Sequence, residues 1–308
     1  MKSTVAARSD AWPLIRSRCA VYLELTRPRI ALLVLFTAAA GFCLASAGAP
    51  DLVRMLHTLI GTALVTGGAS ALNQVLERDG DARMGRTGNR PIPSGRLSPQ
   101  GALLFGIGLA LAGLAYLALA VRQPLTVLTA AFAFAGYVFL YTPLKPRTSL
   151  NTLVGAVAGA TPPVIGWTAA TNALDWPAFV LFAILFLWQV PHFLAIAWLH
   201  RDDYARGGFR MLPMLDPGGG RTACRMVGYG LALIPVSLAP CALGWAGAVY
   251  LVGAAVLGVG FLASTLCFLR TRSAAGARRV LRTSLLYLPA LLAVLLADVT
   301  FQSWAGPW

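Results

Sequence analysis

Long apolar segments separated by short polar ones run through most of the chain. Each apolar segment has about the 20 residues that an α-helix needs to cross the hydrocarbon core of a bilayer. A single turn signal, between Gly244 and Gly247, separates two of them. The pattern predicts an all-α integral membrane protein of one domain with nine transmembrane helices. We expect these helices at residues 30–48, 55–76, 101–121, 125–141, 150–170, 177–199, 227–246, 248–269 and 283–302.

Composition agrees with a membrane location. The chain of 308 residues is 57% hydrophobic and 12% charged, whereas soluble domains carry about 25% charged residues. A formal net charge of +14 would suit nucleic-acid binding, but the basic residues lie in short segments between apolar ones. We therefore expect a lipid bilayer and no nucleic acid as partner. The five cysteines are scattered without a CxxC pair, which argues against a disulfide or metal framework.

The lysines and arginines predict the orientation. If the N-terminus is inside, all of the 25 basic residues except Arg54 and Arg122 fall on the inner side. By the positive-inside rule this places a tail of about residues 1–28 in the cytoplasm and the C-terminus outside. We expect a bacterial cytoplasmic (inner) membrane. The basic tail, with Asp10 and Glu24 as its only acids, leaves a transit peptide and the mitochondrial inner membrane as the alternative.

The most polar stretch, residues 73–99, directly follows the second apolar segment. Asn73, Glu77 and Asp81 are spaced i, i+4 and i+8, so a helix would place them on one face, with successive steps of about 40°. Asp79 is offset to another face. Three side-chain oxygens on one stripe suit Mg²⁺, which takes one or two carboxylates together with water and phosphate oxygens. The plain alternative is a charged loop that fixes topology.

Basic residues accompany this stripe. Arg86 and Arg90 follow it directly, and Lys145 and Arg147 lie in another short segment on the same predicted side. These four side chains are candidates for binding phosphate oxygens. Alternatively, Lys145 and Arg147 simply mark the cytoplasmic side.

A second polar stretch begins inside the sixth apolar segment. Trp188, His192 and His200 fall near one helical face, and Pro191 is expected to kink the helix. A histidine inside a span is costly unless it faces a cavity or a partner, so His192 is either a functional group or hydrogen-bonded to a neighbouring helix.

Two adjacent acids, Asp202 and Asp203, follow at the end of that segment. With the first stripe they would let two metal ions hold one diphosphate. Otherwise they belong to a solvated turn.

A third stretch, residues 141–167, carries a GxxxG pair at Gly155 and Gly159, which predicts close helix packing. Thr161, Pro162 and Pro163 lie in mid-segment and predict a helix bent around a cavity.

Together these stretches resemble the UbiA superfamily of intramembrane prenyltransferases, and within it the branch that farnesylates haem. The resemblance covers roughly residues 24–230 and departs from the usual motif at Glu77, where the family has Asp. It is carried by NQVLERDGDARMGRTGNRPIPSGRLSP, YTPLKPRTSLNTLVGAVAGATPPVIGW and WQVPHFLAIAWLHRDDYARGGFRMLP.

The resemblance implies nine helices around a central cavity open to the cytoplasm, and Mg²⁺-dependent transfer of farnesyl from farnesyl diphosphate to a vinyl group of haem b, giving haem O and diphosphate. Asn73, Glu77 and Asp81 would hold one metal ion, and Asp202 and Asp203 a second. The four basic residues would hold diphosphate, with the haem propionates as the alternative partners for some of them. Tyr141, Trp188 and Phe193 would stabilise the allylic cation or contact substrate. His192 is the candidate haem contact, with His200 as a further possibility. The family alone implies a haem A synthase or another oxidase-assembly protein as partner.

Three rival functions remain. A UbiA-type enzyme acting on an aromatic acid or quinone precursor would share the metal sites but need no haem contact. A secondary transporter would place its charges near the bilayer midplane rather than at the ends of spans. A purely structural subunit would give no reason for two acidic, arginine-rich stretches on one side.

Overall fold

The computed structural model describes residues 19–46 and 48–305, with side chains as far as Gln302. Within these residues, nine helical segments are long and apolar enough to cross a membrane. The prediction of an all-α membrane protein with nine spans is therefore confirmed. The spans are α2 (Pro28–Ala45), α3 (Leu52–Leu76), α5 with η2 (Pro99–Val121), α6 with η3 and α7 (Pro124–Leu144), α8 with α9 (Asn151–Thr171), α10 (Trp176–Leu199), α12 (Gly220–Ala242), α13 (Ala248–Thr271) and α14 (Ala274–Ala305).

Local chemistry sets several helix starts. Asp51 caps α3 by accepting a hydrogen bond from the Arg54 N–H, and Ser98 caps α5 by accepting one from Gly101 N–H at 3.1 Å. Two helices begin earlier than hydropathy predicts: α12 starts at Gly220 and α14 at Ala274. The first two turns of each helix contain two arginines, which lower the hydropathy of the segment but have a high helix propensity.

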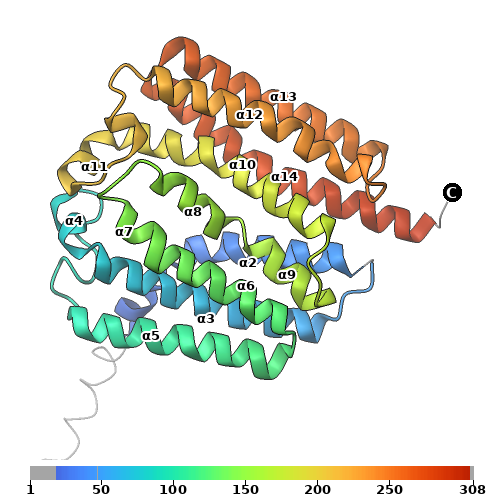
Figure 1. The fold of residues 1–308 in the computed structure, drawn as a ribbon, viewed down its shortest axis with the longest axis horizontal. Coiled ribbons are helices and arrows are strands. Elements are labelled where there is room, and N and C mark those ends of the chain that lie inside the picture. Colours follow the sequence, from blue (N-terminus) through green and yellow to red (C-terminus); the bar gives the residue numbers. More distant parts are fainter. Residues whose placement is uncertain (1–18, 47, 306–308) are drawn as a thin grey trace, which may run out of the picture.

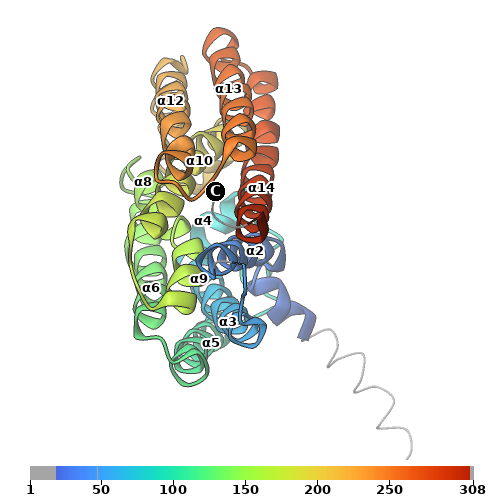
Figure 2. The same ribbon diagram turned by 90° about the vertical axis from the view of Figure 1, so that its right-hand side faces the viewer.

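The spans form two groups when viewed along the helices (Figure 2). One group contains α2, α3, α5, α6 and α9, and the other contains α12, α13 and α14. Helix α10 lies between them and packs on α12 and α14. The largest cluster of buried apolar side chains extends along this α10–α14 region.

Small residues allow the closest helix contacts, as is usual in membrane bundles. A Cβ added to Gly166 of α9 would lie 1.8 Å from Ala38 O of α2, and one added to Gly41 would lie 2.1 Å from Pro163 O. Gly155 faces the Tyr141 ring and Gly159 faces Gln189, so the GxxxG pair is a packing motif as predicted.

Several spans are not uniform α-helices. The fifth is interrupted between α8 (Asn151–Gly159) and α9 (Pro162–Thr171), where Thr161, Pro162 and Pro163 predict a bend. The fourth runs from α6 (Pro124–Ala135) through a π-helical segment, η3 (Gly136–Tyr141), into α7 (Thr142–Leu144). Pro191 lies inside α10 without ending it.

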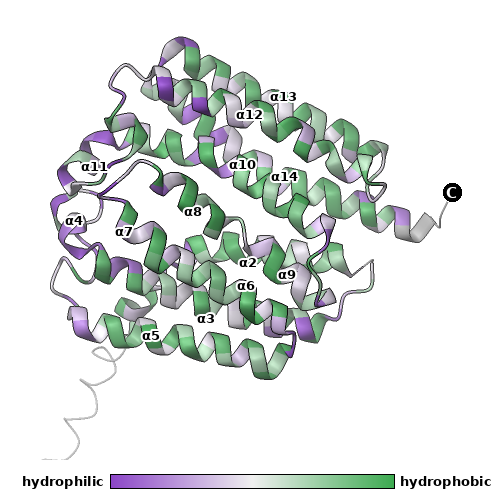
Figure 3. Cartoon of the chain, in the orientation of Figure 1, coloured by the Kyte–Doolittle hydropathy of each residue, from purple (hydrophilic) through white to green (hydrophobic). Residues whose placement is uncertain are grey.

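Polar residues concentrate at one end of the bundle, over the short helices α4 (Arg78–Arg83) and α11 (Arg201–Gly207) (Figures 1 and 3). We call this the polar end. Of the tail predicted at residues 1–28, residues 1–18 lie outside the described part. Residues 19–25 are helical, with Leu25 buried and its carbonyl accepting a hydrogen bond from Gln74 Nε2 at 2.8 Å. This part of the tail therefore packs against α3.

Candidate functional site

The stripe predicted from Asn73, Glu77 and Asp81 is present at the polar end. Helix α3 stops at Leu76, but the helical register continues into α4: Glu77 N–H donates to Asn73 O at 2.9 Å, and Asp81 N–H donates to Glu77 O at 2.8 Å. The three side chains therefore share one face, and their exposed fractions are 0%, 7% and 0%. Asp79, offset as expected, is 86% exposed and pairs with Arg78.

Each of the three side chains has a buried oxygen that accepts no hydrogen bond from any described residue. These atoms are Asn73 Oδ1, Glu77 Oε1 and Asp81 Oδ1. A buried acceptor without a donor costs free energy, so an electropositive ligand that binds all three would be stabilised. Two carboxylates and one amide are the ligands that a hard divalent cation prefers, so these residues fit a Mg²⁺ ion.

Two of the four predicted basic residues already contact these acids. Arg90, 22% exposed, lies 2.5 Å from Asp81 Oδ2, and Lys145 Nζ lies 2.5 Å from Glu77 Oε1, as an ion pair without hydrogen-bond alignment. Lys145 also lies 4.4 Å from the centre of the Tyr141 ring, a cation–π contact. The acids are therefore neutralised within the protein.

Burial dominates the protonation of Asp81. It raises the pKa of this carboxyl above its usual range, although the Arg90 guanidinium acts to lower it. For Lys145, burial is the largest single influence and would lower the pKa of the amine, but the Glu77 carboxylate and the Tyr141 and Tyr137 hydroxyls together raise it above the usual range. A buried carboxylate that is costly to ionise gains from a further positive charge.

The two polar stretches meet at this end of the bundle. Asp203 of α11 accepts a hydrogen bond from Gly85 N–H at 3.2 Å and pairs with Arg206. From the other side, Arg86 donates to the Tyr204 hydroxyl at 3.3 Å and lies over its ring. Segments separated by more than a hundred residues are therefore joined, as the sequence hypothesis requires.

Asp202 and Arg147 are placed differently from their neighbours. Asp202 is 87% exposed and contacts only Arg201, as in a solvated turn. Arg147 is exposed, and its guanidinium has no partner among the described residues. Among those residues there is also no group of three or more His, Cys, Asp or Glu side chains arranged to hold a metal. A metal at the stripe would therefore depend on Asn73 as well as the acids.

The aromatic and histidine candidates separate into two places. Trp188 Nε1 donates to Ser284 O of α14, and His192 Nδ1 lies 2.8 Å from Ser284 Oγ, so these side chains face α14. This is the hydrogen bond to a neighbouring helix that the sequence left open. Phe193 is partly exposed, whereas Tyr141 adjoins the acid stripe.

His200 lies at the junction of α10 and α11, near the charges of Arg86 and Asp203. Partial burial, followed by the Arg86 charge, lowers the pKa of His200. It is therefore close to the meeting point of the two loops rather than to α14.

Comparison with known proteins decides the family. The model of the UbiA prenyltransferase family matches residues 34–300. The chain belongs to this family. The protoheme IX farnesyltransferase of Solibacter usitatus is 50% identical over 286 residues, which cover 90% of this chain and 98% of the relative. The enzyme of the same name from Salinibacter ruber is 46% identical and has the same coverage of both chains.

Solved structures show that the UbiA fold extends over nearly the whole chain. A digeranylgeranylglyceryl phosphate synthase has a TM-score of 0.78 at 16% identity, covering 93% of this chain and all of that one. A UbiA homologue from Archaeoglobus fulgidus bound to GPP and Mg²⁺ has a TM-score of 0.64 at 17% identity, covering 89% and 99%.

Two residues at the UbiA-type site were not found from sequence. Arg27, just before α2, has a left-handed backbone (φ 50°), and its buried Nη2 has no hydrogen-bond partner among the described residues. Its charge acts on both Asp81 and Arg90. Strained backbone often marks functional positions. The only sequence signal was an arginine before proline at the start of a span.

Thr142 is the second such residue. It is buried, and its hydroxyl accepts a hydrogen bond from Asn73 Nδ2 at 3.0 Å. A threonine at the end of an apolar run gives no signal of this contact, which joins residues 69 positions apart.

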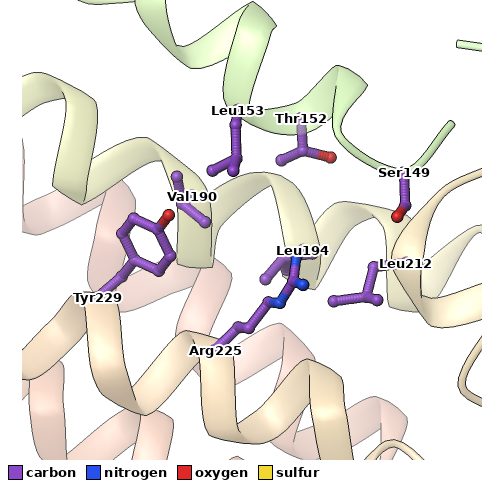
Figure 4. Close-up of a pocket in the computed structure, with 8 residues that line it drawn as sticks. All are labelled: Ser149, Thr152, Leu153, Val190, Leu194, Leu212, Arg225 and Tyr229. Carbon is purple, nitrogen blue, oxygen red and sulfur yellow. The ribbon is translucent and has the colours of Figure 1, made fainter. Parts of the chain in front are cut away.

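A small pocket also opens between α8, α10 and α12 of this UbiA bundle (Figure 4). Arg225 of α12 extends into it, toward an apolar lining that includes Leu153 and Leu194, and Ser149 and Thr152 contribute hydroxyl groups. Arg225 has no hydrogen bond or ion pair with any described residue. The pocket shares no lining residue with the acid stripe.

Proposed function

We propose that this membrane-embedded prenyltransferase transfers a farnesyl group from farnesyl diphosphate to a vinyl carbon of haem b, giving haem O and diphosphate. The observation that carries the chemistry is a set of three buried oxygens at the polar end of an apolar bundle: Asn73 Oδ1 and Asp81 Oδ1 have no partner among the described residues, and Glu77 Oε1 has only the ion pair with Lys145. The names of the relatives support haem as the acceptor.

Asn73, Glu77 and Asp81 would hold a Mg²⁺ ion. The ion, when bound, would neutralise the charge that develops on the departing diphosphate. The protein adds positive charge of its own: Arg90 and Lys145 lie next to the acids and can also bind phosphate oxygens. Arg27 has a buried nitrogen without a partner among the described residues, and its charge acts on Asp81 and Arg90, so it is a further candidate for the diphosphate.

The second loop would complete the diphosphate site. Asp203 lies where the loops meet and is the stronger candidate for a second metal, whereas Asp202 would have to turn in from solvent. Arg86 could release Tyr204 to bind phosphate, and the exposed Arg147 would attract the anionic donor toward the mouth.

The allylic cation must be kept from water until the vinyl carbon reaches it. The apolar bundle around Tyr141 provides that protection, and the Tyr141 ring offers its negative face to a cation, as it already does to Lys145. A water molecule must later add to the alkylated vinyl group to give the hydroxyethylfarnesyl substituent.

We assign the haem side mainly to residues of α10 that face α14, away from the acid stripe. Ser284 Oγ donates its proton to Leu281 O, so His192 would donate from Nδ1 and keep a lone pair on Nε2. We propose His192, with Trp188 and Phe193, as haem contacts, and His200, nearer the meeting point of the loops, as a further one. The unpaired Arg225 in its partly apolar pocket is our candidate for a haem carboxylate.

We place the enzyme in a bacterial inner membrane. The distribution of basic residues supports an orientation in which the polar end faces the cytoplasm, where both anionic substrates would enter. The mitochondrial inner membrane remains the alternative location.

The test is the mass of the product after incubation of the purified enzyme with haem b, farnesyl diphosphate and Mg²⁺. A parallel reaction offers an aromatic acid in place of haem, and its prenylation would favour the quinone-type rival. Asp81→Asn should reduce turnover by at least about 100-fold, because it removes a charged metal ligand. Asp79→Asn, in the same short helix but exposed, is the matched control. Undiminished turnover by the Asp81 variant would refute the metal assignment.

A further inference from the structure

Thr142 makes two hydrogen bonds that connect the fourth span to the acid stripe. Its Oγ1 lies 2.8 Å from Tyr137 O and 3.0 Å from Asn73 Nδ2. All of the groups involved are shielded: Thr142 is 3% exposed and Asn73 is completely buried. The contact therefore joins α3 to the start of α7 in a region without competing water.

The direction of these bonds is determined by chemistry. A backbone carbonyl can only accept, so the Thr142 hydroxyl must donate its single proton to Tyr137 O. The hydroxyl oxygen can then only accept from Asn73, which must present its NH₂ group. The amide oxygen of Asn73 consequently points away from Thr142, and it is the atom that has no donor.

The π-helical segment η3 makes this arrangement possible. Both the backbone N–H and the side-chain hydroxyl of Thr142 bond to Tyr137 O, five residues earlier. In an α-helix the carbonyl of residue 137 would instead bond to the N–H of residue 141. The wider turn therefore brings the Thr142 hydroxyl to Tyr137 O and toward α3. Single π-turns within α-helices are frequent at functional sites.

We propose that Thr142 is a positioning residue that orients the Asn73 amide so that Oδ1, and not Nδ2, is directed to the metal. The inference rests on the proposed metal site. Without this hydroxyl the amide could rotate by half a turn and direct two N–H groups at the cation, which would repel it.

The experiment measures Mn²⁺ binding by electron paramagnetic resonance, with purified protein in detergent and no substrate. Thr142→Val is nearly isosteric and loses both bonds, and we expect Mn²⁺ to bind about 10- to 100-fold more weakly, as for other groups that orient metal ligands. Thr142→Ser retains the hydroxyl and should remain within about threefold of wild type. If the valine variant fails to fold, Thr142→Ala carries the same expectation.

A double variant separates orientation from packing. In an Asn73→Asp background both side-chain ends are oxygens, so no orientation is needed and adding Thr142→Val should change the affinity by less than about threefold. An equal loss in both backgrounds would show a packing role and overturn the proposal. So would wild-type affinity in the Thr142→Val single variant.

The controls distinguish this inference from the proposed function. If wild-type protein binds no Mn²⁺, or if Asp81→Asn binds it equally well, the metal site itself is wrong. If wild type binds, Asp81→Asn does not and Thr142→Val is unaffected, only the role of Thr142 is wrong.

Discussion

Removing the amine of Lys145 should destabilise the folded protein, because the Glu77 charge then stays buried without its partner. In Lys145→Met the two side chains that are now 11% and 6% exposed and 2.5 Å apart lose their attraction. At an effective dielectric constant of about 20, that attraction is about 6–7 kcal/mol before desolvation is subtracted. Breaking a buried pair by removing one partner costs about 3–5 kcal/mol, because the other charge stays buried.

Thermal unfolding of the purified protein in detergent, with a chelator present, provides the measurement. For a chain of this size about 2 °C in Tm corresponds to 1 kcal/mol, so Lys145→Met should lower Tm by about 6–10 °C. The double variant Glu77→Gln/Lys145→Met removes both charges and should recover most of that loss. Added Mg²⁺ should stabilise Lys145→Met more than wild type, since the ion replaces the missing positive charge.

Two results would refute this reasoning. One is a Tm for Lys145→Met within about 2 °C of wild type, which would mean that the Glu77 charge is solvated or protonated. The other is a double variant no more stable than the single one, which would mean that the loss comes from packing of the lysine stem rather than from charge.

The remaining predictions concern the two substrate sides and the bundle. Arg27→Gln should raise KM for farnesyl diphosphate about 10-fold or more and leave KM for haem b unchanged, with the exposed Arg29→Gln as its control; equal effects on both constants would contradict the assignment. Arg225→Gln should raise KM for haem b and leave KM for farnesyl diphosphate unchanged; an unchanged KM for haem b would exclude the pocket around Arg225 as a haem carboxylate site. Gly166→Ala should lower the free energy of unfolding by about 1–3 kcal/mol or more, whereas Gly108→Ala, which adds a methyl group to open space, should be neutral or stabilising.

The sequence predicts the parts of this molecule that depend on local periodicity. In the part of the chain that the structure describes, nine apolar runs specify nine spans. The spacing of Asn73, Glu77 and Asp81 places them on one face because the helical register continues past the end of α3. Helix starts are less predictable, because arginines in the first two turns of α12 and α14 lower hydropathy without ending the helix.

The parts that depend on distant contacts were not predictable from sequence. Asp202 and Asp203 are chemically identical neighbours, and only the fold turns one to Gly85 and the other to solvent. His192 has a polar partner because α14 brings Ser284 to it, 92 positions away. Thr142 contacts Asn73 because of a π-turn that no pattern of residues predicts. The polar contacts of Trp188 and His192 with Ser284 of α14 could therefore be found only from the structure.

The direct backbone contact between α2 and α9 limits how this protein can move. Gly41 and Gly166 leave no side chain between the two helices, so neither helix can slide or rotate without main-chain atoms colliding. The α2–α9 pair therefore moves as one unit, and any rearrangement that admits the flat haem macrocycle must occur elsewhere. At the seam between α10 and α12, side chains such as Leu194 and Arg225 line a small pocket between the helices, so this seam is the place to look for it.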